Sequence, residues 1–91
     1  MLGILHKMRT YKNQVNVTAI TEHFTSVMGW SKDSWGNLKS PKGQYRLHFQ
    51  AISVRLEHAI TYSDGSHGWV LRHTFSLSKD TDKLLAMKPK D

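Results

Sequence analysis

The second half of the chain alternates apolar and polar side chains with the two-residue period of β-strands. Apolar residues occupy odd positions within residues 44–49 but even positions within residues 52–62. Because a shift of one residue exchanges the two faces of a strand, the strand must be interrupted at Gln50-Ala51, by a bulge or bend or by a tight reversal. Gln-Ala has poor turn chemistry, so the pattern favours the bulge or bend.

A β-hairpin over residues 52–62 and 69–77 is the most regular feature of this pattern. Asp64-Gly65 lies between the two segments and is a preferred pair for a two-residue type I′ turn. A turn at that pair predicts the register of the two strands and therefore the composition of both faces.

The predicted register gives the hairpin one polar and one apolar face. Glu57 faces Arg72 on the polar face, which would form an opposite-charge pair. On the apolar face, Ile52, Val54, Leu56, His58 and Ile60 are opposite Leu77, Phe75, His73, Leu71 and Trp69.

A helix is predicted at about residues 18–28, where the apolar residues recur every three or four positions. Thr18 is suited to cap its N-terminus, and Gly29 stands where a glycine commonly ends a helix. The residues before it, 11–17, alternate as a short strand would, although their asparagines weaken that interpretation.

The connecting segments also carry turn and cap residues. Ser31 can cap a single helical turn that runs through Trp35, and residues 40–43 have proline and glycine where a tight turn needs them. Asp80 or Thr81 can cap a last helical turn.

Together these elements predict a small α+β single domain over residues 1–91. An antiparallel sheet, made of the hairpin and a strand at 44–49, packs against one amphipathic helix at about 18–28. Residues 1–10 and 86–91 are expected to fray.

Composition narrows the possible functions. The chain of 91 residues has no cysteine, which excludes disulfides, thiolate nucleophiles and cysteine-based zinc sites. The opening apolar residues are too few for a signal peptide, so a cytoplasmic location is expected. The formal charge of +6 favours a polyanionic or acidic partner. No cofactor is predicted.

Three of the four arginines are predicted on the polar side of the sheet. Arg55 and Arg72 project from the hairpin, and the phase change places Arg46 and His48 on the same side under either explanation. Arginine suits bidentate contacts with phosphate or carboxylate, so this side is a candidate anion-binding surface. The alternative is a solvated strand face on which Glu57 pairs with Arg72.

A second basic region surrounds the loop between the helix and the sheet, with Trp30, Lys32, Trp35, Lys39 and Lys42. The tryptophans can stack on bases or anchor a protein partner, or they can close the core below the helix. The hairpin aromatics are predicted on the apolar side, so the sheet itself offers no stacking platform.

His58 and His73 are predicted as diagonal neighbours on the apolar face. Two histidines do not make a structural zinc site, and His23 or His48 would have to join them. We therefore predict packed histidines, with no metal site and no catalytic residue.

Residues 43–49, 54–56 and 70–75, followed by Lys79, resemble the strand pattern of small basic RelE-type ribonuclease toxins. The resemblance covers fewer than half of the residues, and the region before it is too short for that family's long helical hairpin. The resemblance implies RNA cleavage, with His58, His73 or the arginines as the catalytic groups.

The sequence favours a non-enzymatic basic binding module that contacts nucleic acid or a nucleoprotein complex through Arg46, Arg55 and Arg72. A protein-binding inhibitor or adaptor of the kind encoded by phages and mobile elements, docking on an acidic protein surface, fits the same composition. A small ribonuclease is the lesser alternative. The oligomeric state is left open, with a dimer as one option.

Overall fold

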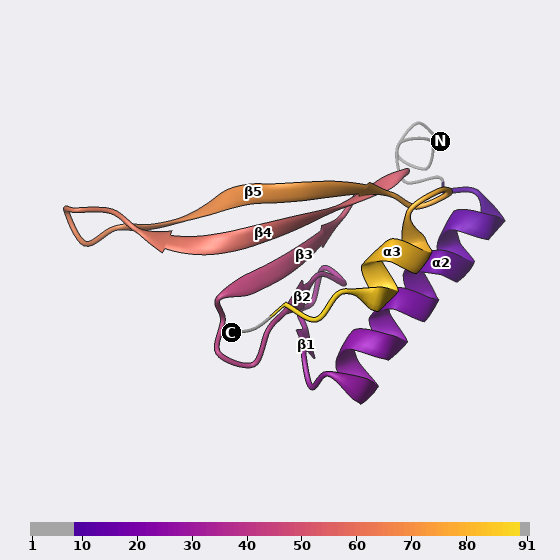
Figure 1. The fold of residues 1–91 in the computed structure, drawn as a ribbon, viewed down its shortest axis with the longest axis horizontal. Coiled ribbons are helices and arrows are strands. Elements are labelled where there is room, and N and C mark those ends of the chain that lie inside the picture. The colour runs from indigo at the N-terminus through magenta and orange to yellow at the C-terminus, as the bar shows by residue number, and fades with distance from the viewer. Residues whose placement is uncertain (1–8, 90–91) are drawn as a thin grey trace.

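In the part of the chain that the structure describes, five antiparallel strands form one sheet in chain order, and two helices cover one of its faces (Figure 1). The computed structural model describes residues 9–89. This is the predicted α+β architecture. The elements are α2 (Tyr11–Glu22), η1 (His23–Val27), β1 (Ser31–Lys32), β2 (Leu38–Lys39), β3 (Tyr45–Phe49), β4 (Ser53–Thr61), β5 (His67–Ser76) and α3 (Thr81–Ala86).

Helix α2 begins about two turns earlier than the sequence predicts and continues into one π-helical turn, η1. Thr10 caps it, because its Oγ1 accepts a hydrogen bond from the backbone N–H of Asn13 at 3.1 Å. Thr18 is therefore an interior residue, and the strand predicted for residues 11–17 is wrong. Gly29, with φ of +76°, follows the helix as predicted.

The asparagines of this segment have structural roles in the helix. Asn13 is buried, and Asn16 donates a hydrogen bond from Nδ2 to the Leu77 carbonyl oxygen at 2.7 Å. The second contact ties α2 to the chain just beyond β5. A residue type that argued against a strand in this segment thus stabilises the packing of a helix.

The apolar core lies between the sheet and the helices. Trp30 is only 4% exposed, and its ring packs edge-on against Phe24 with the ring centroids 4.8 Å apart. Trp30 therefore closes the core, and the prediction that it anchors a partner is wrong. The buried apolar residues are Ile20, Phe24, Trp30, Leu38, Leu47, Val54, Leu56, Phe75, Leu77 and Leu84.

The segment after the helix forms a small β-hairpin in place of the predicted helical turn. Asp33 organises it, because its Oδ1 accepts hydrogen bonds from the backbone N–H groups of Trp35 and Asn37, both at 2.9 Å. Strands β1 and β2 then pair, with Ser31 opposite Lys39. The following turn at 40–43 forms as predicted, closed by a bond from the Gly43 N–H to the Ser40 carbonyl.

The phase change at Gln50-Ala51 is a tight reversal, and the favoured bulge or bend is wrong. Strands β3 and β4 pair antiparallel across it, and the Gln50 N–H donates to the Ser53 carbonyl at 2.8 Å. Arg9 donates from Nη2 to the Gln50 carbonyl at 2.8 Å and from Nε to that of Ala51 at 3.3 Å. A guanidinium distant in sequence thus satisfies a turn whose own residues are poor turn formers. Ile52, predicted in the core, lies in this connection and is 72% exposed.

The hairpin of β4 and β5 closes with a three-residue loop in place of the predicted two-residue turn. The Tyr62 N–H donates to the Ser66 carbonyl at 2.8 Å, and Gly65 has φ of +88°. A type I′ turn would need positive φ at Asp64 too, but no described non-glycine residue has it. The loop is therefore of the kind that carries glycine in its third position.

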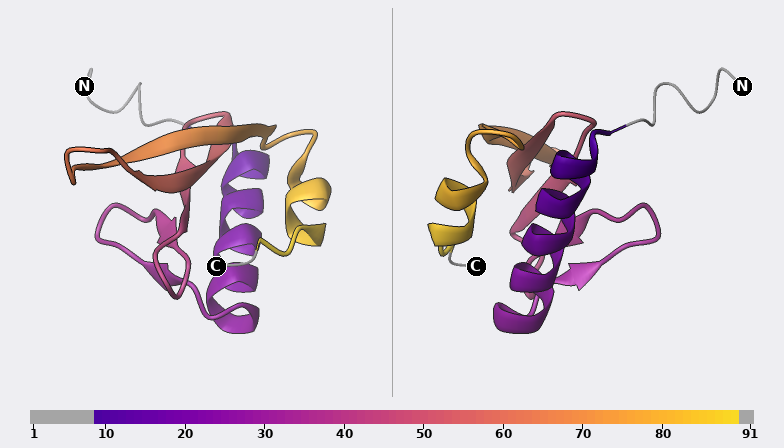
Figure 2. Two further views of the ribbon diagram at one scale, coloured as in Figure 1. Left: turned by 60° about the vertical axis from the view of Figure 1, so that its left-hand side comes forward. Right: turned by 90° about the vertical axis from the view of Figure 1, so that its right-hand side faces the viewer.

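A β-bulge in β5 allows the hairpin to have both this three-residue loop and the predicted strand pairing beside the core. Near the base of the hairpin, Leu56 pairs with His73, as predicted. Toward the tip the register is shifted by one, so Glu57 pairs with Leu71 and Arg72 becomes the extra residue of a bulge. Figures 1 and 2 show this long hairpin extending beyond the part of the sheet that the helices cover.

The predicted terminal helical turn is confirmed as α3, which lies beside α2 on the same side of the sheet (Figure 2). The fraying predicted for residues 1–10 and 86–91 falls mostly on residues 1–8 and 90–91, which lie outside the described residues, and it stays a prediction.

Hydrogen bonds from the Ser66 hydroxyl and then from its backbone N–H hold the pKa of Asp64 below its ordinary value of 3.8. A lowered folded-state pKa stabilises the loop above pH 4, and this contribution is lost as the pH falls through the folded pKa. We expect an NMR titration of the Asp64 carboxyl to have its midpoint below 3.8, and Ser66→Ala to raise it. Ser63→Ala is the control. An equal midpoint in wild type and Ser66→Ala protein would contradict this assignment.

Candidate functional site

The bulge at Arg72 changes which side chains share the face of the sheet that carries no helix. Beyond it, Trp69 pairs with Ala59 and Leu71 pairs with Glu57, so both point away from the helices with the odd-numbered residues of β4. The prediction that Trp69 faces the core is therefore wrong. This helix-free face has an aromatic ring among its arginines.

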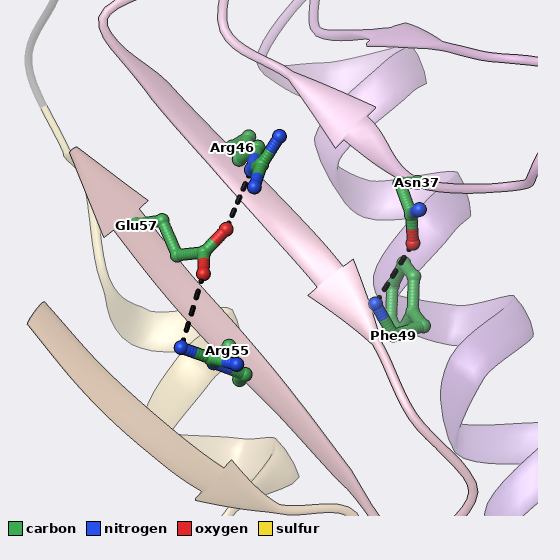
Figure 3. A network of polar contacts seen from close by, with 5 residues as sticks. All are labelled: Asn37, Arg46, Phe49, Arg55 and Glu57. Carbon is green, nitrogen blue, oxygen red and sulfur yellow. Dashed lines mark hydrogen bonds and ion pairs between the residues drawn. The ribbon is translucent and has the colours of Figure 1, made fainter. Parts of the chain in front are cut away.

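A buried carboxylate joins two of those arginines. The Arg46 Nε is 2.5 Å from Glu57 Oε1, and the Arg55 Nη2 is 3.3 Å from Glu57 Oε2. Figure 3 shows Glu57 on β4 between the two guanidinium groups. The Glu57 side chain is 7% exposed, whereas those of the arginines are about one third exposed. The predicted pair of Glu57 with Arg72 is wrong, because Arg72 lies in the bulge.

Arg46 also stacks on Trp69. Its Cζ lies 4.5 Å from the centroid of the indole ring, a cation–π distance. The guanidinium is thus held by Glu57 at Nε and by the ring on one face. Among the described residues, its two Nη groups donate no hydrogen bond, so they remain open to an anion. We call Trp69, Arg46 and Glu57 the Arg46 stack.

Two adjoining hollows lie between the Arg46 stack and the β1–β2 hairpin. Their volumes are about 360 and 490 Å³. Trp69 lines the first hollow and Trp35 lines the second, and we call the two together the tryptophan groove. Both hollows share Asp33, Asn37, Arg46 and His48, and the first is also lined by Ser31, Lys32, Leu38 and Lys39, the second by Phe49.

The groups between the two tryptophans are mostly hydrogen-bond donors. The Asn37 Oδ1 accepts from the backbone N–H of Phe49 at 2.8 Å (Figure 3), which leaves its amide N–H groups as donors. Asp33 Oδ1 already accepts two backbone N–H groups. Lys39 pairs with Arg46 across β2 and β3 and so lies on the same face. The groove suits an anion with a flat apolar part.

The structure separates the remaining predicted site residues. Arg55 belongs to the cluster through Glu57 but does not line the groove. Lys42 is exposed in the turn at 40–43 and is also outside the groove lining. Arg72 lines another hollow, of about 430 Å³, on the helix side of the sheet with His73 and Lys83.

Sequence reasoning missed Trp69, Asn37 and Asp33. Trp69 could have been found by reading Ser63-Asp64-Gly65 as a three-residue loop, which requires a compensating bulge farther along the hairpin. Asp33 carried the usual signal of an aspartate that closes a loop through backbone N–H groups.

The histidines of the apolar face are packed against aromatic rings. His58 lies 4.8 Å from Tyr45 and His73 lies 4.4 Å from Phe75, measured between ring centroids. Among residues 9–89, no group of three potential ligand side chains is placed to hold a metal ion.

No family model, curated protein or solved structure matches the chain. Within the described part of the chain, none of the helices has the length and apolar character needed to cross a membrane.

Proposed function

We propose that this protein is a non-enzymatic binding module for nucleic acid, and that the tryptophan groove between the Arg46 stack and the β1–β2 hairpin is its contact surface. The observation that carries the proposal is the Arg46 stack, which holds Trp69 against an arginine whose Nη groups are open. Stacking rings beside cations are the elements that proteins use to bind unpaired bases and phosphates.

The charge of the surface supports this proposal. Lys32, Lys39, Arg46 and Arg55 outnumber the two nearby carboxylates, and Glu57 is buried beneath the arginines. The whole chain has a formal charge of +6, which favours association with a polyanion at low ionic strength. A cytoplasmic location belongs to the same proposal, and the absence of cysteine agrees with it.

A second candidate is an inhibitor or adaptor that docks on an acidic protein surface. The favouring observation is Trp35, which is 86% exposed at the tip of the β1–β2 hairpin. An exposed tryptophan rimmed by cations can anchor a protein partner. Capture of a nuclease-resistant protein partner that Trp35→Ala abolishes would favour this candidate over nucleic acid.

Lys39→Ala tests the phosphate contacts. We expect weaker binding of labelled 20-nucleotide RNA and DNA of every sequence, with the slope of log K against log salt reduced in magnitude by about 1. Lys12→Ala removes an exposed lysine on α2, outside the groove lining, and is the matched control. Fluorescence anisotropy at several salt concentrations measures both quantities. Equal slopes for the Lys39 and Lys12 variants would contradict the proposed surface.

A further inference from the structure

The tryptophan groove has an aromatic ring at each end and donors between the ends. Trp69 lines one hollow and Trp35 the other, while Arg46, His48 and Asn37 line both. This order of ring, donors and ring corresponds to the order of base, phosphate and base along one strand of nucleic acid. The correspondence concerns a single strand, since only unpaired bases present their faces to protein rings.

The two ring platforms differ in how they are held. Trp69 is half-buried, with Arg46 covering one face of its ring at 4.5 Å, so it is a fixed platform. Trp35 is 86% exposed, and its backbone is held by the bond from its N–H to Asp33 Oδ1. One base would therefore stack on Trp69, whose ring is already held in place, and the next base would cover Trp35, whose ring is otherwise exposed to solvent.

The donors between the rings suit a phosphate. The open Nη groups of Arg46 and the amide N–H groups of Asn37 can both donate to phosphate oxygens. Asp33 is the carboxylate among the described residues that line the groove, and its Oδ1 accepts two backbone N–H groups. Lys39, on the same face as Arg46, adds positive charge at the side of Trp69.

Building on the proposed function, we infer that the groove binds two consecutive unpaired nucleotides, with one base on Trp69, the next on Trp35, and the linking phosphate at Arg46, His48 and Asn37. The binding unit is a dinucleotide step of a single strand. Duplex nucleic acid would be held only by its phosphates.

A length series of oligonucleotides tests this inference with the full chain. The probes are uridine monophosphate, the dinucleotide UpU, oligouridylates of three and five nucleotides, the same series in thymidine, and a 20-base-pair duplex. Titration calorimetry should show at least fivefold tighter binding of the dinucleotide than of the mononucleotide in one or both series, with smaller gains for each later nucleotide. The five-nucleotide strand should bind at least fivefold tighter than the duplex.

Trp35→Ala should remove the gain from mononucleotide to dinucleotide, and Trp35→Phe should retain most of it. Tyr11→Ala is the matched control, because Tyr11 on α2 is also 86% exposed and lies outside the groove lining. Duplex binding should be equal in all three variants.

The outcomes separate this inference from the proposed function. Salt-dependent binding with no gain at the dinucleotide, or with equal affinity for single strand and duplex, would overturn the dinucleotide inference and leave the binding module standing. An unmeasurable affinity for every nucleic acid at low salt would overturn both.

Discussion

Trp69→Ala is expected to lower the affinity for a five-nucleotide single strand by about tenfold or more. The change removes a base platform, and stacking of one base on an aromatic ring contributes about 1–3 kcal/mol. It also removes the ring that holds the Arg46 guanidinium at 4.5 Å, so the phosphate contact should weaken as well. Fluorescence anisotropy with labelled oligouridylate measures the loss.

Two controls isolate the ring of Trp69. Tyr62→Ala removes a 52% exposed aromatic residue where β4 meets the hairpin loop, and it should leave the affinity unchanged. Trp69→Phe keeps an aromatic face and should recover most of the binding. If Trp69→Ala and Tyr62→Ala bound single strands equally well, the Arg46 stack would have no part in recognition.

Glu57→Gln should change stability and affinity in opposite directions. The free energy of unfolding should fall by about 1–3 kcal/mol, because a buried carboxylate that accepts from two arginines is lost while both guanidinium groups remain partly exposed. The affinity for nucleic acid should rise several-fold, because the variant lacks the Glu57 carboxylate that neutralises the charges of Arg46 and Arg55.

Urea unfolding and oligonucleotide titration of the same Glu57→Gln preparation measure the two effects. Leu47→Ala, a core substitution at a residue with no exposed surface, is the comparison. It should lower stability by about 2–5 kcal/mol without raising the affinity of the folded fraction. A Glu57→Gln protein that lost stability but bound no more tightly would indicate that the cluster only stabilises the sheet.

Local pattern was sufficient to predict much of the fold. The two-residue period identified β3, β4 and β5, and the helical spacing with Gly29 identified the C-terminal half of the helix. These features depend on neighbours in sequence. Near the base of the hairpin, Val54 and Phe75 meet the core on the face that the period assigns.

The features of the fold that the pattern did not predict depend on contacts between residues that are distant in sequence. The reversal at Gln50-Ala51 depends on Arg9, about forty residues earlier, and turn propensity contains no information about that donor. The single extra residue at Arg72 moved Trp69 to the helix-free face, because an insertion of one residue in a strand exchanges its faces. Of the residues that the sequence predicted for the site, Lys32, Trp35, Lys39, Arg46 and His48 line the groove, whereas its Trp69 ring was not predicted.

The indole N–H signals of the three tryptophans provide the most direct test of the central claim. In the full chain labelled with nitrogen-15 and titrated with oligouridylate, we predict that the Trp69 and Trp35 signals shift in proportion to occupancy. The buried Trp30, at 4% exposed, should stay in place as an internal control. Saturable binding that left both the Trp69 and Trp35 signals unmoved would contradict the assignment of the tryptophan groove as the nucleic-acid surface.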